Sequence, residues 1–274
     1  MSRIENALEK STSLHARPQP VPQTVALGRR PDERADHPFV PKNPCIVTLT
    51  EPDSPIAEEY RKLKTTVIRL AMQNTKQHAL MVTSSVSGEG KSLTAINLAV
   101  SLAQDVGMSV LLIDADLRRP NLMEYLGIKV KTGLTECLRE GVPVLSAVIK
   151  SGIPRLDLLM AGKGVRNPVE LLSSPSMRSL FEELKRQAPE RSIIIDSPPV
   201  LPFAETQVLS SLVDSVLFVV REGATTVQEL QDALEIIEGA KVLGIVFNGV
   251  TDRTMNNRYY HYYRYYAEQR HQQT

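Results

Sequence analysis

The chain has 274 residues, and its 32 Lys and Arg against 31 Asp and Glu give a formal net charge of +1. Apolar residues make up 42% and charged residues 23%, which are ordinary proportions for a globular protein. The balanced charge argues against bulk nucleic-acid binding, so we expect no nucleic-acid partner. Two cysteines, Cys45 and Cys137, cannot form a disulfide framework and favour a reducing compartment.

The apolar runs of the chain have the length of strands, and none approaches the ~20 apolar residues of a membrane helix. The first residues, beginning Met1-Ser-Arg-Ile4, lack the apolar centre of a signal peptide. We therefore expect a cytoplasmic protein that meets a membrane peripherally or through a partner.

Residues 1–50 are predicted to be a Pro-rich flexible segment. Nine of the 18 prolines lie between Pro18 and Pro55, mixed with charged and polar residues. Such a stretch cannot bury enough apolar surface to offset its ordering entropy. In the first ten residues, Ile4 and Leu8 are four positions apart and form a short apolar stripe. This segment is either a frayed helix or a docking peptide for a partner.

Residues 51–250 are predicted to form one α/β domain. Helical spacing of apolar residues runs from Ile56 to Met72, with Ser54 as N-cap and Pro55 at the first helical position. Apolar, strand-like runs then alternate with helical stretches, which indicates parallel crossovers and a sheet covered on both faces. The strand-like runs are 79–83, 109–113, 156–160, 192–195, 215–220 and 242–247, and the helical stretches are 93–106, 176–187, 204–212 and 227–240. The expected fold is a three-layer sandwich with a mostly parallel, doubly wound sheet.

A phosphate-binding loop follows the first strand, in the run Ser84-Ser-Val-Ser-Gly-Glu-Gly-Lys-Ser92. Glycines let successive N–H groups point inward, and the helix N-terminus adds free donors and partial positive charge. A lysine at this position reaches the β- and γ-phosphates, and the following hydroxyl ligates Mg²⁺. The usual GxxxxGK[ST] pattern fails at one position, where Ser85 replaces the first glycine. The sequence predicts a P-loop NTPase fold that binds ATP and Mg²⁺ through Ser87, Gly88, Glu89, Gly90, Lys91, Ser92 and Leu93.

Three carboxylates end two other predicted strands. Asp114 and Asp116 follow one strand, and Asp196 follows another. Ligands of such sheets bind at the carboxyl ends of the strands, so the three should converge on the Mg²⁺–phosphate region. Arg118 and Arg119 are open between phosphates, acidic partners and surface salt bridges. Asn248, at the end of the last strand, is equally open between reading the adenine edge and forming a turn.

These stretches resemble motifs of the bacterial tyrosine kinases, the autokinases of exopolysaccharide and capsule export. The loop resembles their Walker A motif, Leu112-Ile-Asp-Ala-Asp-Leu-Arg-Arg-Pro120 their Walker A′ motif, and Ile193-Ile-Ile-Asp-Ser-Pro-Pro199 their Walker B motif. Asn167-Pro-Val-Glu-Leu-Leu-Ser173 and the Tyr-rich C-terminus are similar to further stretches of that family. The resemblance covers residues 50 to 266 and implies an ATP-dependent protein-tyrosine kinase.

The resemblance also implies roles for individual residues. Lys91 and Ser92 would hold the phosphates and Mg²⁺, Asp114 would bind the metal and accept the tyrosine proton, and Asp196 would hold Mg²⁺ through water. With Asp116, these aspartates and Lys91 form the candidate catalytic set, and Ser92, Asp114 and Asp196 the candidate metal ligands.

The resemblance further implies an assembly. A single-domain kinase of this family needs a membrane adaptor of the polysaccharide co-polymerase type, whose cytoplasmic tail completes the active state and recruits the kinase to the inner face of the membrane. Glu58, Arg61 and Lys64 resemble the family's ExxRxxR oligomerisation motif, with Lys64 where a second Arg is usual. They would join subunits into a ring, although Glu58 and Arg61 also suit an intrahelical surface pair.

Residues 251–274 are predicted to be a disordered, Tyr-rich tail. Six of the eight tyrosines lie there, and the chain has no Trp: Tyr259, Tyr260, Tyr262, Tyr263, Tyr265 and Tyr266. By resemblance they are the sites of autophosphorylation in trans, reset by a cognate tyrosine phosphatase. Each phosphate adds about −1.5 to −2 charge, so phosphorylated tails would repel one another in a ring.

Other classes stay open. A ParA/MinD-like positioning ATPase shares these motifs but normally carries a signature Lys early in the loop, where this chain has Val86. A non-catalytic, ATP-gated scaffold of a polysaccharide export complex needs no tyrosine chemistry. The tail, with Arg between its tyrosines, also suits stacking on single-stranded nucleic acid or a place at a membrane interface.

Overall fold

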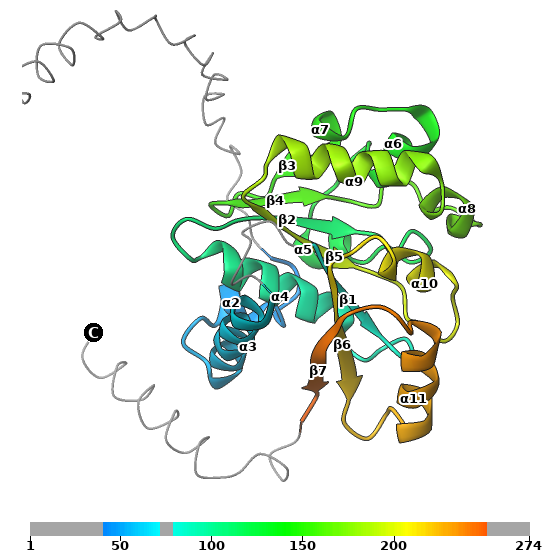
Figure 1. Cartoon of the computed structure of the whole chain (residues 1–274). Helices are drawn as coiled ribbons and strands as arrows, with labels where there is room; N and C mark the ends of the chain where they lie inside the picture. Colours follow the sequence, from blue (N-terminus) through cyan, green and yellow to red (C-terminus); the bar gives the residue numbers. More distant parts are fainter. Residues whose placement is uncertain (1–40, 72–78, 251–274) are drawn as a thin grey trace, which may run out of the picture. The chain divides into compact units, whose positions relative to one another are not determined.

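The computed structural model describes residues 41–71 and 79–250, all of which lie within the compact unit His37–Thr274. Its centre is a seven-stranded sheet in the order β3-β4-β2-β5-β1-β6-β7 (Figure 1). All neighbouring strands are parallel except β3 and β4. The strands are β1 (Ala79–Ser84), β2 (Ser109–Asp114), β3 (Ile149–Lys150), β4 (Leu156–Leu159), β5 (Arg191–Asp196), β6 (Ser215–Arg221) and β7 (Val242–Asn248).

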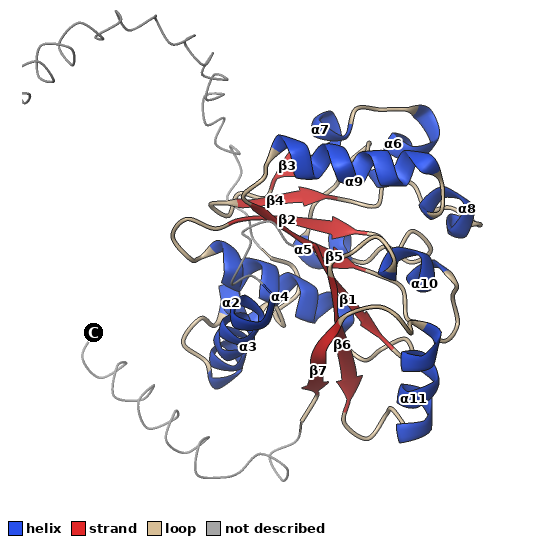
Figure 2. Ribbon diagram, viewed as in Figure 1, coloured by secondary structure: helices blue, strands red, loops and turns tan. Residues whose placement is uncertain are grey.

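Helices cover both faces of this sheet (Figure 2). Strand residues alternate between two apolar cores: Met81 of β1 belongs to one core, and its neighbours Leu80 and Val82 belong to the other. The core with Leu80 also contains residues of α2 (Val47–Thr50), α3 (Pro55–Ala71), α4 (Lys91–Ala103) and α5 (Leu122–Leu126). The core with Met81 contains residues of α6 (Leu134–Glu140), α7 (Val144–Ala147), α8 (Pro168–Leu172), α9 (Pro175–Gln187), α10 (Glu205–Ser210) and α11 (Val227–Ile236). The predicted three-layer sandwich is confirmed.

All the predicted helices and strands form, but several short elements of the structure were not predicted. Ser54 caps α3 as expected, because its hydroxyl accepts a hydrogen bond from the N–H of Ala57 at 3.2 Å. Within the described residues, the sequence pattern missed β3 and five helices, which are between two and seven residues long. Elements this short contain too few residues to show a period.

The segment predicted to be flexible proves to be partly folded. Residues 41–50 lie against the domain, and Ile46 is fully buried in the core that contains α4. Asn97 of α4 secures this segment: its side chain accepts from the N–H of Thr48 at 3.1 Å and donates to the carbonyl of Cys45 at 3.0 Å. For residues 41–50 the prediction of flexibility is therefore wrong, because a few apolar side chains and one buried amide are enough to dock them.

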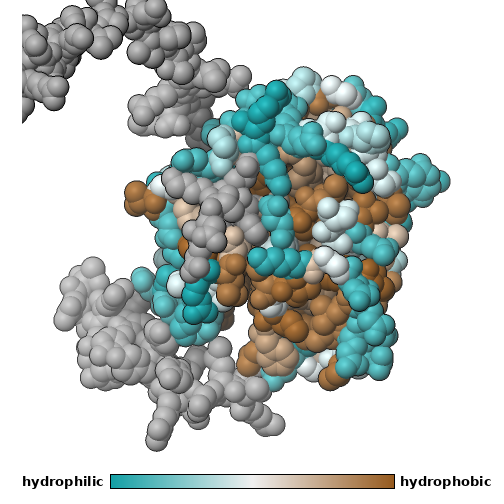
Figure 3. Space-filling model, viewed as in Figure 1, coloured by the Kyte–Doolittle hydropathy of each residue, from teal (hydrophilic) through white to brown (hydrophobic). Residues whose placement is uncertain are grey.

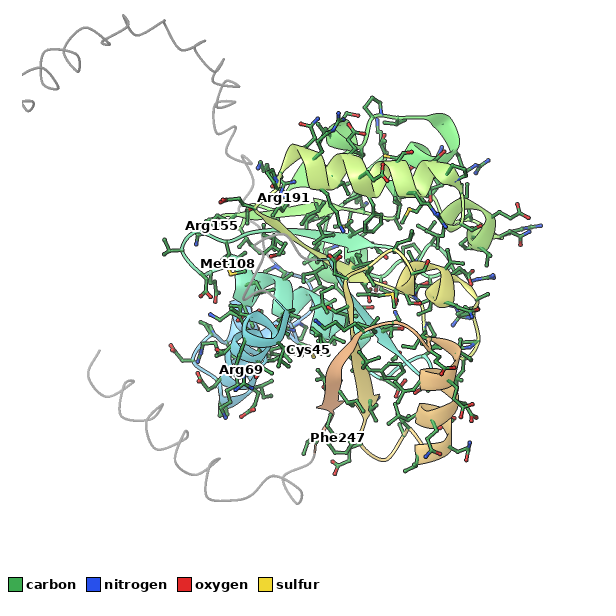
Figure 4. All side chains as sticks on the ribbon, in the orientation of Figure 1. Cys45, Arg69, Met108, Arg155, Arg191 and Phe247 are labelled. Carbon is green, nitrogen blue, oxygen red and sulfur yellow. The ribbon has the colours of Figure 1, made fainter. Side chains whose placement is uncertain are left out.

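The β7 edge of the sheet differs from its centre. Apolar residues gather on the surface over β6 and β7 (Figure 3). Ile245 and Phe247 of β7 are exposed, as are Val227 and Ile236 of α11. Phe247 stands at the end of β7 (Figure 4). Within residues 41–71 and 79–250, every helix is too short or too polar to cross a membrane.

Candidate nucleotide-binding site

The phosphate loop, Ser84–Ser92, connects β1 to α4 and has the geometry that its glycines predict. Gly88 and Gly90 have φ values of +88° and +94°, a region that side-chain-bearing residues rarely adopt. Gly90 has a second constraint, because a Cβ there would lie 2.0 Å from Nδ2 of Asn248. Ser87 and Gly88 are exposed, and Leu93 is half-buried on the first turn of α4. The free N–H groups of that turn make an anion site.

Lys91 brings the predicted catalytic residues together. Its ammonium group lies 3.1 Å from Oδ2 of Asp116 and 3.8 Å from Oδ1 of Asp196, and it donates to the hydroxyl of Ser92 at 3.2 Å. Asp114 is the register partner of Asp196 on the neighbouring strand. The carboxyl ends of β1, β2 and β5 therefore meet at one place, as the topology of parallel strands requires.

The charges of this cluster perturb one another. Burial, then the negative charges of Asp196 and Asp116, raise the pKa of Asp114 well above its ordinary value. Burial also raises the pKa of Asp196, against the opposing effect of Lys91. Burial by itself lowers the pKa of Lys91, but Asp196 and Asp116 outweigh it and raise that pKa. The raised pKa of Lys91 favours its charged form, and the raised pKa values of Asp114 and Asp196 favour their protonated forms.

The cluster suits Mg²⁺ bound together with phosphates. Asp196 is fully buried, and among residues 41–71 and 79–250 neither oxygen of its carboxylate has a hydrogen-bond partner. Within the described part of the chain, no three His, Cys, Asp or Glu side chains are grouped as a metal site of their own. That agrees with magnesium sites in which one or two carboxylates and substrate phosphates share the ion. The residues present therefore fit the ion.

The side chains of Asn248 and of the loop residue Glu89 form hydrogen bonds that the sequence did not predict. Asn248 donates from Nδ2 to the carbonyl of Glu89 at 2.8 Å, so its amide contacts the phosphate loop itself. Glu89 is only 1% exposed, and its carboxylate accepts from the N–H of Val86 at 2.6 Å and from the hydroxyl of Thr225. Its side chain is thus engaged within the protein. The sequence around Thr225 signals only a helix start, because Thr226 and Glu229 form a capping box.

Arg118 forms an ion pair, one of the roles left open for it. Its Nε lies 2.6 Å from Oε1 of Glu205, a fully buried residue at the start of α10. Its guanidinium also lies over the ring of Phe203, 4.8 Å from the centroid. The partner is 87 positions away in sequence, so no local pattern could have identified it.

The three predicted interface residues all have partners within the chain. Arg61 pairs with Glu58 on the same helix and donates to the carbonyl of Pro52 at 2.7 Å. Lys64 pairs with Asp105, just beyond α4, at 2.6 Å. Glu58 and Arg61 thus form the intrahelical surface pair that the sequence left open. The six predicted phosphorylation sites lie outside the described residues.

The fold and this site define a P-loop nucleotide-binding protein. Residues 80–272 match the family described as CobQ/CobB/MinD/ParA nucleotide binding domain. A MinC:MinD cell division protein complex of Aquifex aeolicus is similar with a TM-score of 0.54 at 24% identity, which shows the fold alone.

More specific relatives narrow the class. The tyrosine-protein kinase YwqD of Bacillus subtilis is 38% identical over 206 residues, which cover 74% of this chain and 85% of YwqD. The kinase domain of the Escherichia coli tyrosine kinase ETK has a TM-score of 0.72 at 28% identity, covering 83% of this chain and 87% of that structure. The chain belongs to the bacterial tyrosine kinases.

Relatives in this family differ in length. The putative tyrosine-protein kinase EpsB of Ralstonia solanacearum is 34% identical over 219 residues, but the match covers 78% of this chain and only 29% of EpsB. The chain therefore corresponds to most of YwqD and to less than a third of EpsB.

Proposed function

We propose that this chain is an ATP-dependent protein-tyrosine kinase that phosphorylates its own C-terminal tyrosines in trans and so regulates exopolysaccharide polymerisation and export. The observation that carries the proposal is the meeting of Lys91 with Asp116 and Asp196 beside the phosphate loop. Phosphoryl transfer depends on positioning and on neutralising the phosphates, and this cluster serves both. The tyrosine-rich segment that follows residue 250 provides the acceptors.

Each residue of the cluster has a distinct task. The loop N–H groups and Lys91 bind and orient the phosphates of ATP. Bound Mg²⁺ would neutralise charge on those phosphates, and Ser92, Asp114 and Asp196 are the residues that would hold it. A tyrosine hydroxyl has a pKa of ~10, so it needs a base to become nucleophilic. Asp114, fully buried at the end of β2, is that base.

The same proposal includes the assembly. Copies of the chain form a ring through Glu58, Arg61 and Lys64, which exchange their internal partners for those of a neighbour. A membrane adaptor binds through its cytoplasmic tail and holds the ring at the membrane, and a tyrosine phosphatase resets it. In support, Glu58 and Arg61 are both partly exposed on α3 and accessible to a neighbouring copy.

A positioning ATPase of the ParA/MinD type is the second candidate, favoured by the shared fold. Val86 argues against it, because a signature lysine is usual near the start of the loop in that class.

The test mixes two variants with ATP and Mg²⁺. One is Lys91→Met, which keeps the tyrosines but loses the phosphate contact; the other carries all six clustered tyrosines as Phe and keeps the site. We expect phosphotyrosine on the Lys91→Met chain, mapped by mass spectrometry, only when the second variant is present. Lys241→Met, which changes an exposed lysine far along the chain, is the control and should autophosphorylate like the parent.

Protein concentration is varied in the same experiment, with and without the cytoplasmic tail of a co-polymerase adaptor. Hydrolysis of ATP with no phosphotyrosine under any of these conditions would reject the kinase in favour of the positioning ATPase. Binding of ATP with neither hydrolysis nor transfer would favour the scaffold.

A further inference from the structure

The phosphate loop carries a carboxylate, Glu89, within a site built to bind anions. A free negative charge at this position would repel a triphosphate and cancel part of the field of the loop N–H groups. The structure resolves this conflict by burying Glu89 to 1% exposure and giving both its oxygens donors. Val86 donates its N–H to Oε2 at 2.6 Å, and the hydroxyl of Thr225 donates to Oε1.

Thr225 reaches Glu89 from the connection between β6 and α11. Its hydroxyl has one proton to donate, and that proton goes to Glu89, while its oxygen accepts from the N–H of Arg221 at 3.3 Å. The donor is therefore oriented by the backbone at the end of β6. Among the common residues, only serine can reproduce this arrangement.

Two other side chains brace the same stretch of the loop through its carbonyls. Arg221 donates from Nη1 to the carbonyl of Gly88 at 3.2 Å, and Asn248 donates to the carbonyl of Glu89 at 2.8 Å. Bonds to these carbonyls hold the peptide units of the loop in one orientation. Thr225 differs from both, since it contacts the charged side chain rather than the backbone.

We propose that Thr225 is a positioning residue of the phosphate loop, which holds the Glu89 carboxylate away from the nucleotide and thereby sets the affinity for ATP. This inference rests on the proposed function only in that the loop binds ATP. It gives an uncharged residue, 136 positions from Glu89 in the sequence, control over a charge inside the loop.

The experiment measures the dissociation constant of a fluorescent ATP analogue by titration. We expect Thr225→Val to weaken binding about tenfold, because a charged hydrogen-bond acceptor loses its donor, and Thr225→Ser to stay within about threefold of the parent. The loss should be larger for the triphosphate than for the diphosphate, since the released charge repels ATP more strongly.

A second pair of variants separates charge from shape. In the Glu89→Gln background, adding Thr225→Val should change the affinity by less than about twofold, because no charge is left to release. A purely structural role for Thr225 predicts the same tenfold loss in both backgrounds, and that result would overturn the proposal, as would parental affinity in Thr225→Val. If Thr225→Val fails to fold, Thr225→Ala removes the same hydroxyl and replaces it in both backgrounds.

Nucleotide affinity is measured without any tyrosine transfer. A chain that shows this pattern but never forms phosphotyrosine would therefore refute the kinase function while leaving the role of Thr225 intact. If the parent chain forms phosphotyrosine but Thr225→Val has unchanged ATP affinity, the kinase function is supported and the role of Thr225 is refuted.

Discussion

The buried acids at the ends of β2 and β5 differ from the buried acid of the phosphate loop in the partners that their side chains have. At the ends of β2 and β5, Asp114 and Asp196 crowd together. Neither oxygen of Asp196 has a hydrogen-bond partner among the described residues, and the ammonium group of Lys91 lies 3.8 Å away. Toward β6 and β7, Glu89 receives two donors and is braced further through its carbonyl. Both sets are equally buried, so burial does not explain the difference.

The difference separates acids kept for a ligand from acids that build the site. Asp114 accepts from the N–H groups of Asp116 and Leu122, both at 3.3 Å, but it shares its site with two other negative charges. Burying carboxylates this close together costs the fold free energy, and the raised pKa values of Asp114 and Asp196 express that cost. Such a cost persists where a bound cation repays it during function. A fully partnered carboxylate such as Glu89 needs no cation.

The largest effect should follow from removing the negative charge of Asp196. Asp196→Asn replaces a Mg²⁺ ligand by a weak one, and metal-based charge stabilisation is worth several kcal/mol, so the rate of phosphotyrosine formation should fall roughly a hundredfold or more. Initial rates at saturating ATP measure this. Asp157→Asn, at a buried acid on β4, is the matched control and should keep the parental rate. Equal losses in the two variants would erase the distinction between the two kinds of acid.

The sequence could predict much of this arrangement, and the reason is physical. Parallel strands bring their carboxyl ends to one edge of the sheet. The convergence of Asp114, Asp116 and Asp196 could therefore be predicted from their positions at strand ends alone. The loop was readable from its glycines and Lys91.

The side-chain contacts of Thr225 and Glu205 could not be predicted from the sequence. Thr225 and Glu205 act through partners 136 and 87 positions away, and these contacts depend on how loops fold over the sheet edge. The docking of residues 41–50 was not predicted for a similar reason, since it depends on the burial of Ile46 and on contacts with the distant residue Asn97. Pro41 and Pro44 made the stretch look like a continuation of the Pro-rich segment before it, although Ile46 packs in the core.

A second effect concerns stability and its dependence on pH. An acid whose pKa is higher in the folded chain than its ordinary value of 3.8 binds more protons when folded, so its contribution to stability falls as the pH rises through the raised pKa. Asp114→Asn lacks this loss. The difference in Tm, variant minus parent, should therefore increase between pH 5 and pH 8 by at least ~2 °C, which is about 1 kcal/mol for a domain of this size.

Thermal unfolding in EDTA without nucleotide measures that difference. A constant difference across the pH range would show that Asp114 is not strained in the free protein. The variant should also lose phosphotyrosine formation, because the proposed base is gone, so stability and activity should change in opposite directions.

A partnered acid should respond with the opposite sign. Asp157 pairs with Lys150 at 2.9 Å and with Arg191 at 3.0 Å, and its side chain is 9% exposed. Asp157→Asn leaves Arg191 without its charged partner, so the free energy of unfolding should drop by about 1 kcal/mol. Urea unfolding at pH 7 measures this. An unchanged or higher midpoint would mean that two cationic partners do not distinguish Asp157 from Asp114.

The smallest effect is expected at an ion pair on the surface. It extends the comparison of acids to one that has a partner but is not buried. Glu58 and Arg61 have side chains 27% and 39% exposed, and such pairs contribute only ~0.3–0.5 kcal/mol within a helix. Glu58→Gln should therefore shift Tm by no more than ~1–2 °C, while Glu59→Gln, at the neighbouring pair with Lys62, serves as the matched control. The two variants differ if Glu58 also bonds to a second copy: light scattering should then show a smaller assembly for Glu58→Gln alone. Equal masses for both variants and the parent would leave Glu58 an intrahelical partner of Arg61 and place the subunit contact elsewhere on the surface.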